Sequence, residues 1–212
     1  MFANNYLFHK SNQSILASMV FFVTLSSLHG KKAIAVMSAV ALFVASFFRG
    51  DCIPRIVEEA SANPRVFHAP CYGKVTHISQ RDNKTVVSVF LSLFDKHFQH
   101  IPCYSLIKDT EFIPGKFEFA QLYEKTANNA RMIYKMFSPV FGSYEIHQVA
   151  GFIARAIVPF VKRGMICEAG EELGMIRFGS RIDIILPSTH RVLVHVGDRV
   201  HGPETALAIA SQ

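Results

Sequence analysis

The sequence predicts a β-rich (α+β) protein in which an antiparallel sandwich-like or barrel-like domain follows an N-terminal apolar helical hairpin. Two observations predict this fold class. From Asp51 onward, short β-rich runs alternate with turn signals at a spacing of about 8–12 residues, which is typical of sandwiches and barrels. Before Phe48 the chain holds two apolar runs and no acidic residue. We therefore expect a hydrophobic hairpin over residues 1–50 and a folded domain over residues 51–212.

The composition excludes a disordered or fibrous chain. Half of the 212 residues are hydrophobic and 18% are charged, below the usual charged share of roughly 25%. The 22 lysines and arginines exceed the 16 acidic residues, so the formal net charge is +6. An excess of this size suits an anionic surface, either phospholipid or nucleic acid, and does not choose between them.

The cysteines are spaced too widely and irregularly to predict a disulfide framework or a zinc ligand set. We expect reduced thiols, as in a cytoplasmic protein. The four positions are Cys52, Cys71, Cys103 and Cys167.

The two apolar runs, Ile15–Leu28 and Ala33–Phe48, predict a helical hairpin that attaches to a membrane. As helices they would be roughly 21 and 24 Å long, short of the roughly 30 Å hydrocarbon thickness. They could span if flanking cations such as Lys10 and Arg49 snorkel, or the pair could enter one leaflet. Basic residues at both ends leave the orientation open.

Two alternatives compete with membrane attachment. Lys10 ahead of an apolar run is also typical of a secretory signal peptide, but the second apolar run and the cysteine usage speak against export. A soluble helical pair would have to be covered on every side. We expect the protein at the cell membrane, peripheral or anchored by the hairpin on the cytoplasmic side.

Seven runs after residue 73 combine β-branched or aromatic residues with flanking turn signals, and we predict each as a strand. A turn at Arg81-Asp82-Asn83 separates the first two. Two stretches, Val57–Ala62 and Phe119–Ala127, are helical candidates. The predicted strands are Lys74–Ile78, Thr85–Leu93, Arg131–Phe137, Tyr144–Ile153, Ala156–Lys162, Arg181–Leu186 and Arg191–Val196.

A Gly179-Ser180 pair interrupts the segment Gly174–Pro187 between two β-like runs, where a strand ordinarily avoids glycine. Such a pair by itself indicates a turn or bulge far more often than a nucleophile. Its meaning depends on the segments that accompany it.

His97 and His100 follow Asp95 in an Asp-x-His-x-x-His pattern. Imidazole titrates near neutral pH, so the pair could transfer protons in a reaction. The two histidines could equally line a solvated strand face. A zinc pair is a third reading, which three-residue spacing without further clustered ligands supports only thinly.

Taken together, these segments resemble the phosphatidylserine decarboxylase family over roughly Phe47 to Ile209. The resemblance includes the compact form of the family, to which enzymes of archaeal serine lipids belong. It is specific because separate segments occur in the family's order. They are Leu91–Pro102, Pro114–Phe117, Asn129–Arg131, Gln148–Gly151, Gly174–Pro187 and Val196–Val200.

The resemblance implies a proenzyme that cuts itself between Gly179 and Ser180 into chains 1–179 and 180–212, which remain associated. Ser180 would become a pyruvoyl group, the only cofactor, with no metal. The amine of phosphatidylserine would form a Schiff base with it, giving phosphatidylethanolamine and CO2. By the same resemblance His100 activates Ser180, and His97 acts in decarboxylation, for instance by protonating the product carbanion.

The partners implied are a membrane and its phosphatidylserine, with no nucleic acid, and a homo-oligomer is possible. Arg155, Arg177 and Arg181 are candidates for binding the anionic head group, because guanidinium matches carboxylate and phosphate bidentately. Equally, they could pair with Asp183 or Glu172 or face water.

The chain departs from the family at two acidic positions. Tyr72 stands where the family has an aspartate that orients the histidine, and Ala130 replaces the glutamate of an Asn-Glu-Arg motif. Three outcomes stay open: maturation without the acid or with Asp95 in its place, slow cleavage, or a catalytically silent homologue that binds anionic lipid.

A carrier-domain partner protein is an alternative from another class, because Val161–Gly164 and Val196–Val200 lead into turns like those of swinging-arm barrels. Such domains need a lysine at a hairpin tip, and no lysine follows Lys162.

Overall fold

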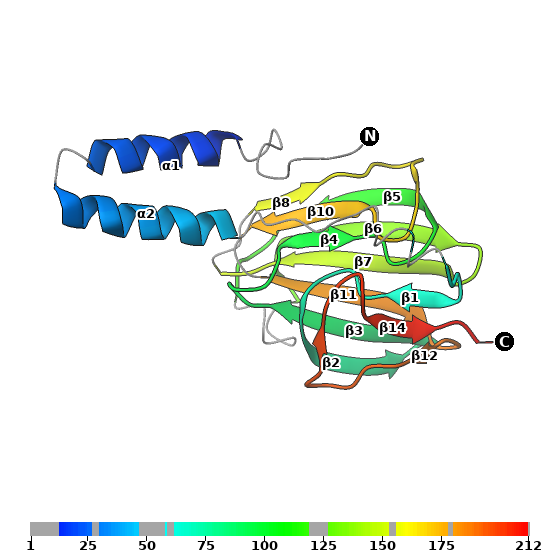
Figure 1. Cartoon of the computed structure of the whole chain (residues 1–212). Coiled ribbons are helices and arrows are strands. Elements are labelled where there is room, and N and C mark those ends of the chain that lie inside the picture. The colour runs from blue at the N-terminus through cyan, green and yellow to red at the C-terminus, as the bar shows by residue number, and fades with distance from the viewer. Residues whose placement is uncertain are drawn as a thin grey trace. The chain divides into compact units, whose positions relative to one another are not determined.

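A computed structural model describes residues 13–26, 30–46, 58, 62–118, 127–152, 156–177 and 180–211. It divides into two compact units, Met1–Asp51 and Cys52–Gln212 (Figure 1).

The first unit contains two helices, α1 (Gln13–Ser26) and α2 (Lys31–Ser46). Gly30 begins α2: its carbonyl accepts the first helical hydrogen bonds at a φ of +91°, a backbone conformation that glycine adopts without strain. Large apolar side chains on both helices, such as Phe21 and Leu42, are more than 60% exposed. In the part of the chain that is described, no helix is both long and apolar enough to cross a bilayer.

The second unit is built from antiparallel strands in three sheets. The largest has the order β13-β2-β3-β11-β7-β6-β5-β9, and the smaller ones are β4-β10-β8 and β1-β14-β12. Its strands are β1 (Val66–His68), β2 (Gly73–Arg81), β3 (Lys84–Leu91), β4 (Phe98–His100), β5 (Ser105–Ile113), β6 (Arg131–Ser138), β7 (Gly142–Ala150), β8 (Ala156–Pro159), β9 (Ile166–Cys167), β10 (Glu172–Arg177), β11 (Ser180–Pro187), β12 (Arg191–Val192), β13 (Arg199–Val200) and β14 (Ala206–Ile209).

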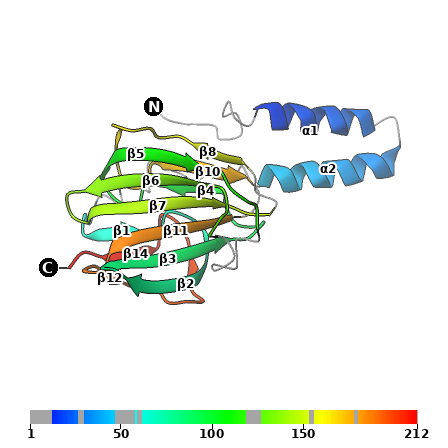
Figure 2. The same cartoon turned by 180° about the vertical axis from the view of Figure 1, so that it is seen from behind.

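The two small sheets cover one face of the eight-stranded sheet. They lie in front of it in Figure 1 and behind it in Figure 2. Strand register shows which side chains face this core: Ile182 of β11 lies opposite Val89 of β3, and Ile184 lies opposite Val87. All four are fully buried. The layered arrangement is a sandwich rather than a closed barrel, so the predicted β-rich fold class is confirmed in its sandwich form.

The predicted turn at Arg81-Asp82-Asn83 joins β2 to β3 directly. Arg81 pairs with Lys84, which leaves Asp82 and Asn83 as a two-residue loop. Both have positive φ, 50° and 60°, as a type I′ turn requires. Aspartate and asparagine tolerate this conformation better than other side chains that carry a Cβ.

Some predicted boundaries are wrong. The run Ala156–Lys162 ends as a strand at Pro159, which has no N–H to donate. Only Arg191–Val192 of the last predicted strand belongs to a ladder. β5 escaped prediction because the polar stretch Lys108-Asp109-Thr110-Glu111 breaks its alternation, and a register shift lies there. The helical candidates at 57–62 and 119–127 lie almost entirely outside the described residues.

Candidate active site

Ser180 is the first residue of β11, a strand that is paired on both sides. It lies opposite Leu91 of β3 and Ala150 of β7. The Ser180 side chain and the whole of Gly179 lie outside the described residues. The structure therefore defines this position through its backbone and through the segments that surround it.

The end of β7 beside Ser180 is held by Asn129. The Asn129 side-chain amide donates to the carbonyl of Ala150 (2.8 Å), and the Ala150 N–H donates to the carbonyl of Ala130 (2.9 Å). Asn129 also exchanges two hydrogen bonds with the Glu118 backbone and is 1% exposed. The sequence did not predict this role for Asn129, because its hydrogen-bond partner Ala150 lies 21 positions further along the chain.

The segment Pro70–Val75 reaches the same end of the large sheet. A Cβ on Gly73 would lie 2.3 Å from the carbonyl oxygen of Phe90, so only glycine allows β2 to approach β3 this closely. In the antiparallel ladder between β2 and β13, Lys74 lies opposite Arg199. This pairing places the closing Val196–Val200 segment beside β2. The segments that are separate in sequence thus converge around the beginning of β11.

Asp95 stabilises the turn that follows β3. One carboxylate oxygen accepts hydrogen bonds from the backbone N–H and the hydroxyl of Ser92, at 2.8 and 2.7 Å, and the other pairs with Arg199. Asp95 is 7% exposed. These contacts join the turn to the Val196–Val200 segment.

His100 is the last residue of β4, in one of the smaller sheets, and His97 directly precedes that strand. Both are buried, at 0% and 1% exposure, so the alternative that they line a solvated face is wrong. The Ile176 N–H donates to the His97 carbonyl (3.2 Å), which places His97 beside the end of β10, four residues before Ser180. The His100 N–H donates to the carbonyl of Pro70 (2.8 Å), so β4 also touches the Pro70–Val75 segment.

Tyr72 faces a cation. The Lys96 ammonium donates to the Tyr72 hydroxyl at 3.1 Å and lies 4.5 Å from the centre of its ring. The His201 ring meets the same phenol edge-on, with centroids 5.8 Å apart. At the position where the resemblance implies a carboxylate, the chain therefore has a phenol ring that contacts an ammonium group.

Among the candidate arginines, Arg181 is already paired. Its guanidinium donates to both Asp183 oxygens at 2.7 and 2.9 Å, and the two residues are 2% and 5% exposed. The pairing alternative is thus confirmed for Arg181, and a head group would need another cation. Burial lowers the pKa of the Arg177 guanidinium, which stands three residues before Ser180. Arg155 lies outside the described residues.

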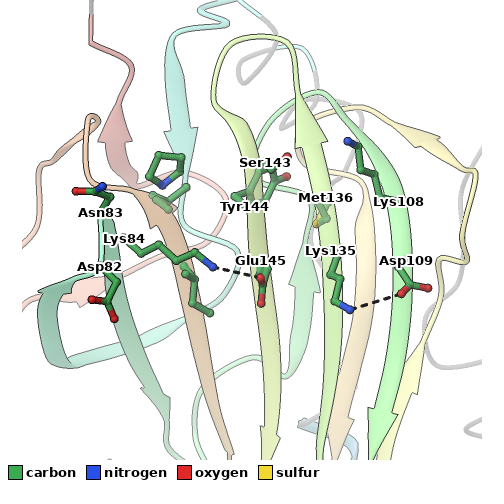
Figure 3. Close-up of a pocket in the computed structure, with 13 residues that line it drawn as sticks. Asp82, Asn83, Lys84, Lys108, Asp109, Lys135, Met136, Ser143, Tyr144 and Glu145 are labelled. Carbon is green, nitrogen blue, oxygen red and sulfur yellow. Dashed lines mark ion pairs between the residues drawn. The ribbon is translucent and has the colours of Figure 1, made fainter.

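A hollow lies at the other end of β11, around Pro187. Four of its charged side chains form ion pairs with one another: Lys84 with Glu145 and Lys135 with Asp109, each at 3.6 Å (Figure 3). It is far from Ser180, because β11 runs eight residues at about 3.3 Å each. The hollow is therefore separate from the candidate residues around Ser180.

The cysteines with described positions, Cys71, Cys103 and Cys167, are buried free thiols. Burial raises the pKa of Cys71 well above its ordinary value, and the nearby Asp95 charge raises it further. A thiol in this state is a poor nucleophile at neutral pH. Cys52 lies outside the described residues.

The structure thus places two buried histidines close to the end of β10 and to the Pro70–Val75 segment, and a serine at the beginning of the central strand β11. Comparison with known proteins identifies the family. The family described as phosphatidylserine decarboxylase matches residues 40–208. The chain belongs to this family of decarboxylases.

Several curated relatives are similar in sequence. A phosphatidylserine decarboxylase proenzyme of Prosthecochloris aestuarii is 39% identical over 79% of this chain and 77% of the relative. One of Chlorobium luteolum is 34% identical over 84% of each. A putative archaetidylserine decarboxylase proenzyme of Methanothermobacter thermautotrophicus is 39% identical over 58% of this chain, and the match spans about half of that relative, 54%.

Proposed function

We propose that the chain is a self-processing phosphatidylserine decarboxylase whose reactive group forms at Ser180. The observation that carries this proposal is the convergence of the family's separate segments around the beginning of β11. The relatives named as proenzymes support processing.

In the proposed maturation, His100 accepts the proton of the Ser180 hydroxyl as its oxygen attacks the carbonyl of Gly179. The amide becomes an ester and the Ser180 amine is freed. Elimination then breaks the Cβ–O bond, so that chain 1–179 ends in the Gly179 carboxylate. Water replaces the nitrogen of the remaining dehydroalanine, ammonia leaves, and a keto group stays at the start of chain 180–212.

The sheet suits such a product. β11 is paired with β3 from Ser180 to Pro187 and with β7 from Ser180 to Ile185, so a new chain end at residue 180 would stay in register between Leu91 and Ala150. The pyruvoyl group would supply an electron sink for the loss of carboxylate from a primary amine. His97, buried beside the end of β10, would then deliver a proton to the product carbon.

A lipid substrate fits the surroundings of this strand end. Phe94 and Phe152 follow the two partners of Ser180 by three and two residues, and they are 74% and 54% exposed. Exposed aromatic side chains on both sides of a reactive position suit contact with acyl chains or the membrane interface. We propose that these side chains and the apolar hairpin attach the enzyme to the cell membrane.

A catalytically silent homologue that binds anionic lipid is the second candidate. The contact between Lys96 and Tyr72 favours it, because an ammonium at the position of the missing carboxylate gives an imidazolium no anion to stabilise it.

A denaturing gel with intact mass and a hydrazine probe tests the proposal. An active enzyme should give a 33-residue fragment, residues 180–212, that begins with a keto group and reacts with hydrazine. Ser180→Ala should abolish the fragment, the hydrazine adduct and CO2 release from carboxyl-labelled phosphatidylserine. A single unbroken wild-type chain that binds vesicles would establish the silent homologue instead. CO2 release that persists in Ser180→Ala would show that the keto group forms elsewhere.

A further inference from the structure

A buried network of hydrogen bonds connects the large sheet to β4 and to His97, which directly precedes that strand. The Tyr134 hydroxyl of β6 donates to the Gln148 carbonyl oxygen of β7 (2.5 Å). The Gln148 amide donates to the Gln99 carbonyl oxygen of β4 (2.6 Å), and the Gln99 amide donates to the backbone carbonyl of His97 (2.8 Å). Tyr134, Gln148 and Gln99 are all 0% exposed.

The Tyr134 hydroxyl determines which group donates and which accepts in each hydrogen bond of this network. Burial raises the pKa of the Tyr134 hydroxyl far above its ordinary value, so the phenol stays protonated and donates. Gln148 must then turn its carbonyl oxygen toward Tyr134 and its amide toward Gln99. Gln99 therefore accepts from Gln148 through its side-chain carbonyl oxygen and donates through its amide to the His97 carbonyl.

Gly174 of β10 leaves room for the side chains of this hydrogen-bond network. A Cβ at this position would lie 3.1 Å from both the Gln148 amide nitrogen and the Tyr134 hydroxyl, and 2.8 Å from the Val158 carbonyl. A larger residue would push the small sheet away from the large one. The sequence around Gly174 therefore accommodates the polar contact between the layers.

The hydrogen-bond network lies close to both parts of the proposed active site. Gln148 lies opposite Ile182 of β11, two residues from the pair formed by Ala150 and Ser180. At the other end, the His97 carbonyl accepts from Gln99 and also from the Ile176 N–H of β10. Each link is short and excluded from water, and a buried donor or acceptor left without a partner is costly.

We propose that Tyr134, Gln148 and Gln99 form an interlayer clamp, a set of positioning residues that holds His97 at a fixed place relative to the Ser180 strand. The effect on catalysis rests on the proposed function; the effect on the position of His97 does not. Because a displacement of about 1 Å can cost a hundredfold in rate, loss of the clamp slows the reaction without removing a reacting group.

Tyr134→Phe is the test, and Tyr144→Phe is its matched control. Tyr144 also lies in the large sheet, and its hydroxyl shares a 2.6 Å hydrogen bond with Ser105. That pair is buried, at 2% and 0% exposure, and joins β7 to β5 without reaching β4. Each substitution removes one buried hydroxyl from a tyrosine.

We expect Tyr134→Phe to lower kcat at least tenfold with little change in KM, whereas Tyr144→Phe leaves kcat within twofold. Hydrogen exchange at the Ile176 amide, whose acceptor is the His97 carbonyl, should accelerate in Tyr134→Phe alone. The triple variant Tyr134→Phe/Gln99→Met/Gln148→Met leaves no polar side chain of the clamp unsatisfied. It should recover the melting temperature but not kcat.

Three results would overturn the clamp. One is an unchanged kcat and an unchanged Ile176 exchange rate in folded Tyr134→Phe; another is an equal loss of kcat in both phenylalanine variants. The third is recovery of kcat together with melting temperature in the triple variant, which would mean that the network only stabilises the fold. If the wild-type chain proves unprocessed, the proposed function fails, and the exchange rate at Ile176 still decides the clamp.

Discussion

At position 72 the chain exchanges a carboxylate for a phenol, and the structure shows what accompanies the exchange. Lys96 donates to the Tyr72 hydroxyl and sits over its ring, next in sequence to the buried His97. A carboxylate at this site would stabilise an imidazolium, whereas a neutral phenol with an ammonium does not. We therefore expect the substitution to affect the rate of the proposed maturation more than the fold.

Tyr72→Asp should accelerate self-cleavage. The new carboxylate would pair with Lys96, cancel its charge and favour proton uptake by His100. The measurement is the half-time for appearance of the 180–212 fragment after synthesis, with Tyr72→Asn as the control that shortens the side chain without adding charge. An unchanged half-time in the aspartate variant would mean that another group orients His100.

Arg181 and Asp183 illustrate the cost of a buried charge beside the site. Asp183→Ala should destabilise the fold by about 3–5 kcal/mol, because Arg181 would remain buried without its carboxylate. Replacing both by apolar residues, as in Arg181→Met/Asp183→Leu, should recover most of that loss. Urea unfolding of the two variants measures the difference. A small loss in Asp183→Ala would show that Arg181 finds another anion.

At the scale of elements, tight turns set strand register. The two-residue loop Asp82-Asn83 places Arg81 opposite Lys84 and thereby aligns β2 with β3. Because β3 in turn aligns Leu91 with Ser180, an error at this loop would move the beginning of β11 relative to the Pro70–Val75 segment.

Asn83→Ala should lower the free energy of unfolding by about 1 kcal/mol, because alanine is strained at a φ of 60° and lacks the local hydrogen bonds of asparagine. Asn83→Gly, which has no such strain, should be neutral or slightly stabilising. Thermal or urea unfolding distinguishes them. Equal stability of the two variants would contradict the type I′ assignment.

At the scale of the whole molecule, the position of Ser180 explains how a cut protein would stay in one piece. The chain after residue 180 supplies β11 in the middle of the large sheet, β13 at its edge, and both β12 and β14 in a small sheet. The 33-residue fragment, 180–212, is thus held through several ladders and a shared core.

We expect the two chains of the processed protein to elute together in size-exclusion chromatography under native conditions. They should separate only in denaturant, since release of the fragment exposes the buried Ile182, Ile184 and Leu207. Peptide mass analysis of each fraction is the measurement. Elution of the 33-residue fragment alone in native buffer would contradict this expectation.

The sequence alone was sufficient for the features that depend on local chemistry. Alternation of apolar residues predicted strands such as Arg131–Phe137, asparagine and aspartate marked the β2–β3 turn, and motif order indicated the decarboxylase family. The strand and turn signals are carried by residues close together along the chain, and the family signal by short motifs that can be read in order without knowing which of them meet.

Only the tertiary structure decided which distant residues meet. It set Lys96 against Tyr72, and it linked Tyr134 and Gln148 to Gln99 across 35 and 49 positions of sequence. Such contacts depend on strand order and on the packing of two sheets, and no local periodicity encodes them. The sequence therefore determined the elements and the candidate chemistry, and packing determined which side chains support the site.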